Sequence, residues 1–254
     1  MTIFISCYVF ALGLLLGSFF TVVGMRVPAN ESVVFSGSYC PNCKIPLKGR
    51  DLIPLLSFLI SRTQCRYCQQ SISWFYPFGE AATGILFLWI YLRFGLTLAG
   101  LNGLILVSLT IIISISDLKY MLIPNKILLF FLPVMLVLRL WFPIHTLWNH
   151  LLGALVGGGI ILLIVIVTRG DMGMGDAKLF FLCGWVVGFP HILLSLFIAS
   201  LLGTWVGGIL LLLKIVKLKQ ALPFGPFLAL GTLITYGYGA DIIHLYLAIV
   251  DNGI

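Results

Sequence analysis

The stretch from Gly170 to Lys178 reads Gly-Asp-Met-Gly-Met-Gly-Asp-Ala-Lys and separates two long apolar runs of the chain. It holds Asp171 and Asp176, which are two of only eight acidic residues among 254. An acid beside a membrane-buried helix is energetically costly and by default indicates a functional site. The three glycines allow the backbone to turn sharply and to approach a neighbour closely. The structural alternative is a tight polar loop that only joins two membrane helices.

The composition excludes the soluble globular class. Charged residues make up 9% of the chain and its mean hydropathy is +1.14, whereas a soluble domain carries roughly 25% charged residues. We therefore expect an all-α polytopic membrane protein with about eight transmembrane helices. The expected apolar segments are Thr2–Met25, Phe75–Tyr91, Leu96–Ser116, Ile127–Phe142, Leu147–Thr168, Leu179–Val187, Ile192–Leu213 and Phe227–Val250.

Several of these segments carry further information. The first has no charged residue and lacks the basic start of a secretory signal, so we expect a retained membrane helix. The sixth is short and the eighth contains Gly237, Gly239 and Asp241, so a tilted, re-entrant or broken helix is the alternative to a full span in both. Glycines inside two other segments predict close helix packing. These are Gly157, Gly158, Gly159, Gly203, Gly207 and Gly208.

The basic residues predict the orientation of these helices in the membrane. With the N-terminus outside, all of the 15 basic residues except Arg93 and Arg139 fall in inside loops. Because cytoplasmic loops of membrane proteins are enriched in Lys and Arg, we expect both termini outside and Asp176 on the cytoplasmic side. The net charge of +7 is dispersed among these loops, which argues against nucleic acid as a partner.

The first inside loop, about residues 26–74, contains two CxxC pairs, Cys40 with Cys43 and Cys65 with Cys68. Each pair can aim two thiolates at one tetrahedral metal ion, and two pairs complete a closed four-sulfur zinc site of the zinc-ribbon kind. Disulfides are not expected in a cytoplasmic loop, and a loop with so few core residues needs a stabilising metal. Protein fills all four positions, so we expect a structural zinc. A redox dithiol or unliganded cysteines are the alternatives.

Asp117 ends the third apolar segment, on the same side of the membrane as Asp176. Pro124 delays the next helix, and irregular backbone at membrane depth is tolerated only where protein covers it or where it lines a wet cavity. If the two carboxyl groups come within a few ångströms, like charge disfavours double ionisation and the pair shares a proton. One member can then take a proton from water while the other donates to an amide, as in aspartic proteases. The alternatives for Asp117 are a helix cap or an ion pair with Lys119 or Lys178.

Gly173-Met174-Gly175-Asp176 resembles the GxGD signature of intramembrane aspartyl proteases, and the surrounding motifs are similar to those of the type IV prepilin peptidases. The resemblance covers nearly the whole chain in order. It is carried by Gly17-Ser18-Phe19, Arg26-Val27-Pro28, the paired CxxC knuckles, Tyr76-Pro77 with Glu80, Asp117 with Ile123-Pro124-Asn125, the stretch from Gly173 to Lys178, and Pro223 to Leu228. One departure is Thr21, where relatives commonly have Asn.

This resemblance implies a bacterial enzyme of the inner membrane. Such enzymes remove the short basic leader of type IV prepilins, and of pilin-like secretion or DNA-uptake proteins, at the cytoplasmic face and typically between Gly and Phe. It implies Asp117 and Asp176 as the catalytic aspartates. They would lie in a membrane aspartyl protease core of residues 76–254, which follows a first transmembrane helix (1–25) and a zinc loop (26–75). Asp171 lies outside this pair and is interpreted as a loop acid or as a group that steers the basic leader.

Relatives with the cysteine loop are usually bifunctional and also N-methylate the new terminal amine with S-adenosylmethionine. Glu80 at the membrane edge is a candidate to hold or deprotonate that amine, with a salt bridge to a nearby Arg or a capped helix start as the structural alternative. No nucleotide-binding glycine loop is visible, so the S-adenosylmethionine site is not placed. Two alternatives remain for the whole chain: a peptidase without methyltransferase activity, and a small membrane transporter, which predicts two related halves that the sequence lacks.

Overall fold

The computed structural model describes residues 2–33, 37–40, 42–141, 147–168, 172–217, 220 and 222–251. Within these residues the secondary structure is helical, and only two isolated β-bridges accompany the helices. The chain divides into two compact units, Met1–Lys119 and Tyr120–Ile254. The all-α fold predicted from the apolar composition is confirmed.

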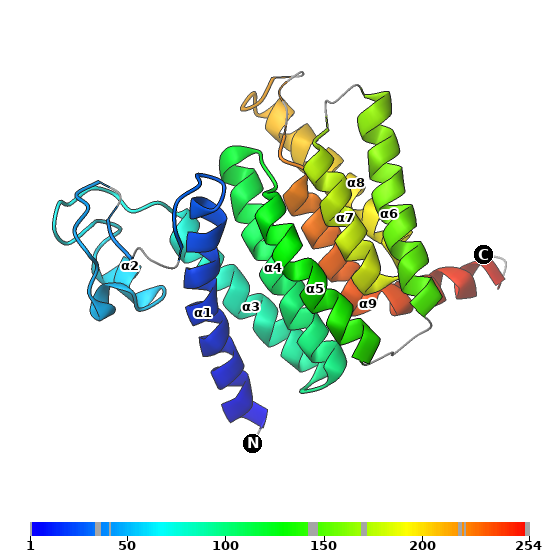
Figure 1. Ribbon diagram of the computed structural model, residues 1–254, viewed down its shortest axis with the longest axis horizontal. Helices are drawn as coiled ribbons and strands as arrows, with labels where there is room; N and C mark the ends of the chain where they lie inside the picture. Colours follow the sequence, from blue (N-terminus) through cyan, green and yellow to red (C-terminus); the bar gives the residue numbers. More distant parts are fainter. Residues whose placement is uncertain are drawn as a thin grey trace. The chain divides into compact units, whose positions relative to one another are not determined.

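Each of the eight apolar segments is a helix (Figure 1). Six of them are long and apolar enough to cross a membrane, which makes the chain a multi-pass membrane protein. α5 has 17 residues and α7 has 14; at 1.5 Å per residue, α7 is about 21 Å long and shorter than a hydrocarbon core of about 30 Å. The eighth segment is one continuous helix. The helices are α1 (Thr2–Arg26), α3 (Phe75–Phe94), α4 (Leu98–Tyr120), α5 (Asn125–Trp141), α6 (Leu147–Val167), α7 (Met174–Val187), α8 (His191–Leu212) and α9 (Gly225–Asp251).

In the first unit, α1 and α3 pack backbone to backbone through small residues. A Cβ atom built on Gly17 would lie 2.9 Å from the Cα of Glu80, and one built on Gly13 would lie 2.8 Å from the Cα of Gly84. Only a residue without a side chain permits so close an approach. Thr21 is fully buried in the same interface, where its hydroxyl donates to the carbonyl of Gly17 at 2.8 Å. The departure from the family pattern at this position therefore fills a helix-packing site.

α4 is the most buried of the six long helices. Gly24 of α1 packs on it, because a Cβ there would lie 2.8 Å from the carbonyl oxygen of Ile112. The helix ends at Tyr120, and Met121 follows with φ 51°. The chain then runs without helix through Pro124 to the start of α5, as the proline predicts. Asp117 thus lies one turn before the end of α4 and is not at a helix start, which excludes the capping interpretation.

In the second unit, the short helix α7 packs against α5, α6, α8 and α9 (Figure 1). The closest contact is between α6 and α7, where a Cβ on Gly153 would lie 2.5 Å from the carbonyl oxygen of Gly184. α8 and α9 also pack against each other, and the hydroxyls of Ser195 and Thr232 are hydrogen-bonded at 3.0 Å between them. α7 is therefore the central helix of this unit.

The glycines predicted to pack closely divide into two groups. A Cβ on Gly157 would lie 2.7 Å from Ile192 of α8 and 3.1 Å from the Phe180 carbonyl of α7, and one on Gly158 would lie 3.0 Å from Phe181 of α7. Cβ atoms on Gly203 and Gly207 would each lie 3.3 Å from a side chain, those of Phe224 and Leu222. At Gly159 and Gly208, however, no atom lies within 4 Å of a built Cβ. The packing prediction is wrong for these two residues, because each is on a helix face that the described residues leave open.

Candidate functional site

The four cysteines of the loop between α1 and α3 lie together. Their sulfur atoms are all within 4.8 Å of one another, and Cys40 and Cys68 are 3.9 Å apart. A tetrahedral ion with metal–sulfur bonds of about 2.3 Å holds its sulfurs roughly 3.8 Å apart, so the thiols are placed as ligands of one ion. Cys40 and Cys65 are buried, and Cys43 and Cys68 are half-buried. The four cysteines can therefore hold a metal ion.

The two CxxC pairs adopt the same turn. In the first pair, the Cys40 N–H donates to Ile45 and the Lys44 N–H returns to the Cys40 carbonyl at 2.9 Å. In the second, the Cys65 N–H donates to Gln70 and the Gln69 N–H returns to the Cys65 carbonyl at 2.8 Å. Each bridge that closes a pair is antiparallel, and the residue after each second cysteine has a positive φ, 59° at Lys44 and 56° at Gln69. This repeated geometry is the product of the sequence pattern itself.

The two half-buried thiols of the cluster, Cys43 and Cys68, differ in pKa. The backbone N–H of Gln70 and the side-chain amide of Asn42 lower the pKa of Cys68 to about 6. A hydrogen bond from the Ile45 backbone lowers the pKa of Cys43, but burial and the neighbouring thiols Cys40 and Cys68 oppose it, and the pKa is raised to about 11. The thiolate is the form that binds a metal, and the hydrogen bonds from Gln70 and Asn42 favour that form at Cys68.

Asp51 ties the second cysteine pair to the rest of the loop. It lies in the 3-10 helix η1 (Gly49–Asp51), and its carboxylate is 3.3 Å from the Arg66 guanidinium. The hydroxyl of Tyr67 and the backbone N–H of Lys48 also donate to it, both at 3.2 Å. Arg66 and Tyr67 are the two residues between Cys65 and Cys68. A buried carboxylate thus fixes the segment that presents two of the four sulfurs.

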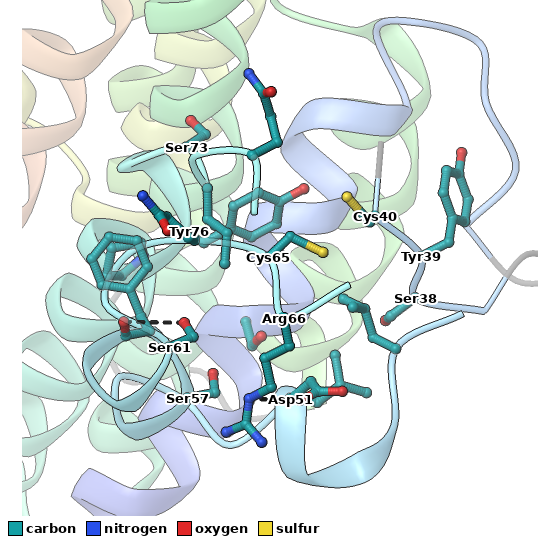
Figure 2. Close-up of a pocket in the computed structure, with 18 of the residues that line it drawn as sticks. Ser38, Tyr39, Cys40, Asp51, Ser57, Ser61, Cys65, Arg66, Ser73 and Tyr76 are labelled. Atoms are coloured by element: carbon teal, nitrogen blue, oxygen red, sulfur yellow. Dashed lines mark hydrogen bonds and ion pairs between the residues drawn. The ribbon is translucent and has the colours of Figure 1, made fainter. Parts of the chain in front are cut away.

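A cavity of about 240 Å³ lies between this loop, α1 and α3 (Figure 2). Its wall includes Cys40, Cys65 and Arg66 from the loop, and Tyr76 and Glu80 from α3. Six serine side chains also line it, which gives it many hydroxyl groups. They are Ser18, Ser38, Ser57, Ser61, Ser71 and Ser73.

Glu80 is a buried acid of this cavity, with 7% of its surface exposed. The backbone N–H of Leu55 donates to its carboxylate at 2.8 Å, and the Ser18 hydroxyl is a second hydrogen-bond partner. Leu55 has φ 58° and ψ −48°, and the Leu56 N–H donates to the Pro54 carbonyl across it. This is the rare γ-turn, which is strained for a bulky residue. The loop therefore holds a costly backbone conformation whose N–H is directed at Glu80, immediately before helix α2 (Leu56–Ile60).

The salt bridge and helix-start interpretations of Glu80 are not what the structure shows. Its partners are the Leu55 amide and the Ser18 hydroxyl, and it lies in the second turn of α3, which begins at Phe75.

The two candidate aspartates are both buried. Asp117 lies in the last turns of α4 in the first unit, with 6% of its surface exposed. Asp176 lies in the first turn of α7 in the second unit, with 8% exposed. Both positions agree with the expectation of acids at the ends of apolar segments. Asp171, Gly170 and Arg169 lie outside the residues that the structure describes.

The glycines of the GxGD stretch have separate steric roles within the second unit. A Cβ on Gly175 would lie 2.7 Å from the Cβ of Ile123, in the segment between α4 and α5. A Cβ on Gly173 would lie 3.3 Å from the carboxylate oxygen Oδ2 of Asp176. One glycine therefore lets the start of α7 contact the segment at Ile123, and the other leaves room for the Asp176 carboxylate.

A hydrogen bond joins two further residues of the sequence motifs. The ammonium group of Lys178 donates to the Asn125 side-chain carbonyl at 2.9 Å, which links the second turn of α7 to the first residue of α5. Lys119, which the sequence offered as an ion-pair partner of Asp117, directs its ammonium group at the Met25 sulfur at 3.4 Å. Sequence reasoning missed Leu55, because a backbone N–H carries no signal until tertiary contacts select it. It noted Ser18 and Asn125 only as parts of motifs and assigned neither a hydrogen-bond partner.

Two family models and several curated proteins match the chain. A model of the bacterial peptidase A24 N-terminal domain matches residues 11–94, and a model of the type IV leader peptidase family matches residues 104–208. The chain is 38% identical to a prepilin leader peptidase/N-methyltransferase of Bacillus subtilis (strain 168), over 94% of this chain and 96% of the relative. It is 31% identical to proteins of the same name from Pseudomonas putida, over 91% and 90%, and from Legionella pneumophila, over 83% and 75%. No solved structure matches the chain.

Proposed function

Because the chain belongs to the type IV leader peptidase family, we propose that it is a membrane aspartic endopeptidase that removes the short basic leader from prepilins and pilin-like proteins. It also N-methylates the new terminal residue of the product. The observation that carries the proposal is the buried carboxyl of Asp176 in the first turn of α7. That residue and Asp117 both fall within the part of the chain that the leader peptidase model matches.

The peptidase step uses Asp117 and Asp176 as a pair. The ionised member takes a proton from a water molecule, whose oxygen attacks the carbonyl carbon of the Gly–Phe bond. The protonated member donates to the leaving nitrogen, so the leader departs with a new carboxylate and the mature protein with a new amine. Two carboxyls that share one proton serve this purpose because each can hold the proton in turn.

The covalent connection between α4 and α5 supports this pairing. Asp117 is joined to Ile123 by one turn of helix and a short non-helical segment, and Ile123 contacts Gly175 beside Asp176. The chain therefore connects Asp117 to the segment at Ile123, and that segment contacts Gly175, the residue before Asp176.

The proposed orientation follows from the basic residues. The cysteine loop and both acids lie at the cytoplasmic face of the bacterial inner membrane, and both termini lie outside. A prepilin leader is basic and precedes an apolar helix, so its cleavage point lies at the same face. An acid at the end of a short helix such as α7 is at the depth that this substrate requires.

Methyl transfer is assigned to the cavity between the cysteine loop, α1 and α3. When bound there, S-adenosylmethionine supplies an activated methyl group. The cavity residues fit such a ligand, since serine hydroxyls and Tyr76 offer hydrogen bonds and a stacking surface next to a buried carboxylate. Its volume of about 240 Å³ is smaller than the roughly 300 to 1,000 Å³ of most ligand pockets, so a ligand of this size would extend out of the cavity.

Glu80 has the chemistry to hold the substrate amine in this cavity. Its carboxylate binds the terminal ammonium of the mature protein and accepts its proton, which frees the nitrogen lone pair for attack. The Leu55 amide and the Ser18 hydroxyl fix the carboxylate in position. The four cysteines would hold zinc with protein ligands alone, and such a metal would stabilise the loop and would take no part in the reaction.

The test is to incubate the purified protein with a prepilin precursor, with and without S-adenosylmethionine, and to analyse the product by mass spectrometry. We expect leader removal in both cases and a terminal residue heavier by one methyl group only with the methyl donor. Leader removal without methylation would leave a peptidase only, and an intact precursor would contradict the proposal.

A further inference from the structure

The short helix α2 in the cysteine loop has two different faces. Its inner face, Ser57 and Phe58, lines the cavity between the loop, α1 and α3 (Figure 2). Its outer face, Leu56, Leu59 and Ile60, is apolar and open, and both Leu59 and Ile60 are 69% exposed. Large apolar side chains gathered on one exposed face mark a contact surface. α2 is therefore a thin wall between the cavity and whatever covers its outer face.

Contacts of the loop show how deep α2 lies relative to the membrane helices. The Leu55 N–H, directly before α2, donates to Glu80, whose other partner is Ser18 of α1. Ser18 lies eight residues before the end of α1 at Arg26, which is about 12 Å along the helix axis. α1 has 25 residues and is about 37 Å long, so it exceeds a hydrocarbon core of about 30 Å by only about 7 Å. The level of Ser18 is therefore inside the hydrocarbon core, and α2 begins beside it.

α2 also packs on the start of a lipid-facing stripe of α3. This helix is long and apolar enough to cross a membrane. Its exposed residues Phe78, Ile85 and Leu92 recur every seven residues and so share one face. Trp74, exposed and one turn before Phe78, packs edge-on against Phe58 of α2 with ring centroids 5.1 Å apart. Because tryptophan is enriched where a bilayer meets water, α2 lies between the hydrocarbon core and the headgroups.

We propose that α2 is an interfacial membrane helix whose outer face inserts into the leaflet around the end of α1 and the start of α3. Interfacial helices bury an apolar face roughly 5 to 10 Å into the boundary between headgroups and acyl chains, which matches the depth of α2. Lipid then supports the outer side of the wall whose inner side lines the cavity. It also holds the strained turn at Leu55, which precedes the helix and directs its N–H at Glu80.

The first experiment measures the surroundings of the outer face in the full-length protein, reconstituted in phosphatidylcholine vesicles. A fluorescent amino acid is placed at Leu59 or, as the matched control, at Ile45, which is also an exposed aliphatic residue of the loop. The first knuckle, which contains Ile45, lies at the level of the charged end of α1. The Ile45 carbonyl accepts from the Cys40 N–H, and the ring of the preceding Tyr39 lies 4.8 Å from the Arg26 guanidinium.

We expect lipid that is brominated near the carboxyl end of its acyl chains to quench most of the emission at Leu59 and little at Ile45. Aqueous iodide should do the reverse. Equal iodide quenching at the two positions would show that α2 faces water. Resistance of the Leu59 probe to both quenchers would show that protein, such as a second copy of the chain, covers the outer face. Either result would overturn the inference.

The second experiment tests the consequence for the cavity, and this consequence rests on the proposed methyl transfer. Leu59→Asp puts an acid into the apolar part of the leaflet, which is costly. Leu59→Phe keeps the position apolar, and Ile45→Asp puts the same acid into the first knuckle. We expect methylation of a pre-cleaved pilin to fall at least about tenfold in Leu59→Asp, with zinc content and leader removal unchanged. The other two variants should methylate like the wild type.

Wild-type methylation by Leu59→Asp, or equal loss in Ile45→Asp, would contradict the support of the cavity by lipid. A wild-type enzyme that transferred no methyl group would instead contradict the proposed function, and the quenching at Leu59 would still decide whether α2 lies in the membrane.

Discussion

Glu80 and Asp176 are both buried carboxyl groups near the start of a membrane helix, yet different parts of the chain hold them. The contacts of Glu80 come from segments far apart in sequence, the Ser18 hydroxyl of α1 and the Leu55 amide of the cysteine loop. Around Asp176, Gly173 leaves room for its carboxylate and Gly175 seats its helix on Ile123, and all of these residues belong to the same unit. The Glu80 site therefore depends on a folded loop, and through it on the four-cysteine cluster, whereas the Asp176 site depends on helix packing within its own unit.

This difference predicts that the two activities separate by mutation. The largest effect is expected for the aspartates. Asp176→Asn and Asp117→Asn each keep the shape of the side chain but cannot share a proton, so we expect leader removal to fall by at least about 10³-fold. Methylation of a pilin that has already lost its leader should stay within about twofold of wild type, because Glu80 and its cavity are unchanged. The measurements are cleavage on gels and methyl incorporation from a labelled donor. Full processing by either single variant would remove that aspartate from the catalytic pair.

The next largest effect concerns the metal. The double variant Cys40→Ser and Cys43→Ser removes two of four ligands, and structural zinc contributes about 10 kcal/mol or more to the folding of such loops. We expect purified protein to lose its single zinc ion by elemental analysis and methylation to fall by roughly 100-fold or more, since the Leu55 amide no longer reaches Glu80. Leader removal should persist at a measurable rate.

The matched control for the metal prediction is Cys7→Ser, because Cys7 lies on an exposed face of α1, away from the four-sulfur cluster. This variant should keep zinc and both activities. If the double variant retained zinc, the assignment of the four cysteines as ligands would fail.

A smaller and more specific effect is expected at Glu80. Glu80→Gln preserves size and hydrogen-bond acceptance but removes the charge and the ability to take a proton, and a general base contributes roughly 10²- to 10⁴-fold. We expect methylation of pre-cleaved pilin to fall by about 10²-fold while zinc content and leader removal stay unchanged. Because a substrate amine that is already deprotonated needs no base, the defect should shrink as pH rises toward the pKa of the amine, near 8. A defect that is equal at all pH values would indicate that Glu80 only positions the substrate.

The smallest effect is expected at Gly175, next to Asp176, and concerns leader removal only. Gly175→Ala places a Cβ atom 2.7 Å from the Ile123 Cβ, so the start of α7 must shift by a few tenths of an ångström. We expect leader removal to fall roughly tenfold, because displaced catalytic groups lose rate steeply, and methylation to be unaffected. Gly49→Ala, in the cysteine loop where a Cβ meets nothing within 4 Å, should leave both activities intact. Equal cleavage by Gly175→Ala and wild type would show that this contact does not position Asp176.

The amino-acid sequence by itself determined the membrane fold, the helix positions and the cluster of four cysteines that can hold a metal ion. Apolar runs that must satisfy their backbone within lipid become helices, and two CxxC pairs carry their turn geometry locally, which is why both adopt the same bridge. The acids at segment ends were likewise visible, because charge is rare in an apolar chain.

Only the tertiary structure decided which groups surround those residues. It placed the Leu55 amide on Glu80, distinguished the packed Gly158 from the open Gly159, and made the short α7 the centre of its unit. These outcomes depend on which helix faces meet, and helix propensity and hydropathy are nearly the same for every apolar face. The sequence pattern therefore identifies the residues that carry the chemistry of this protein. The close contacts between glycines and backbone atoms determine where its cavities lie.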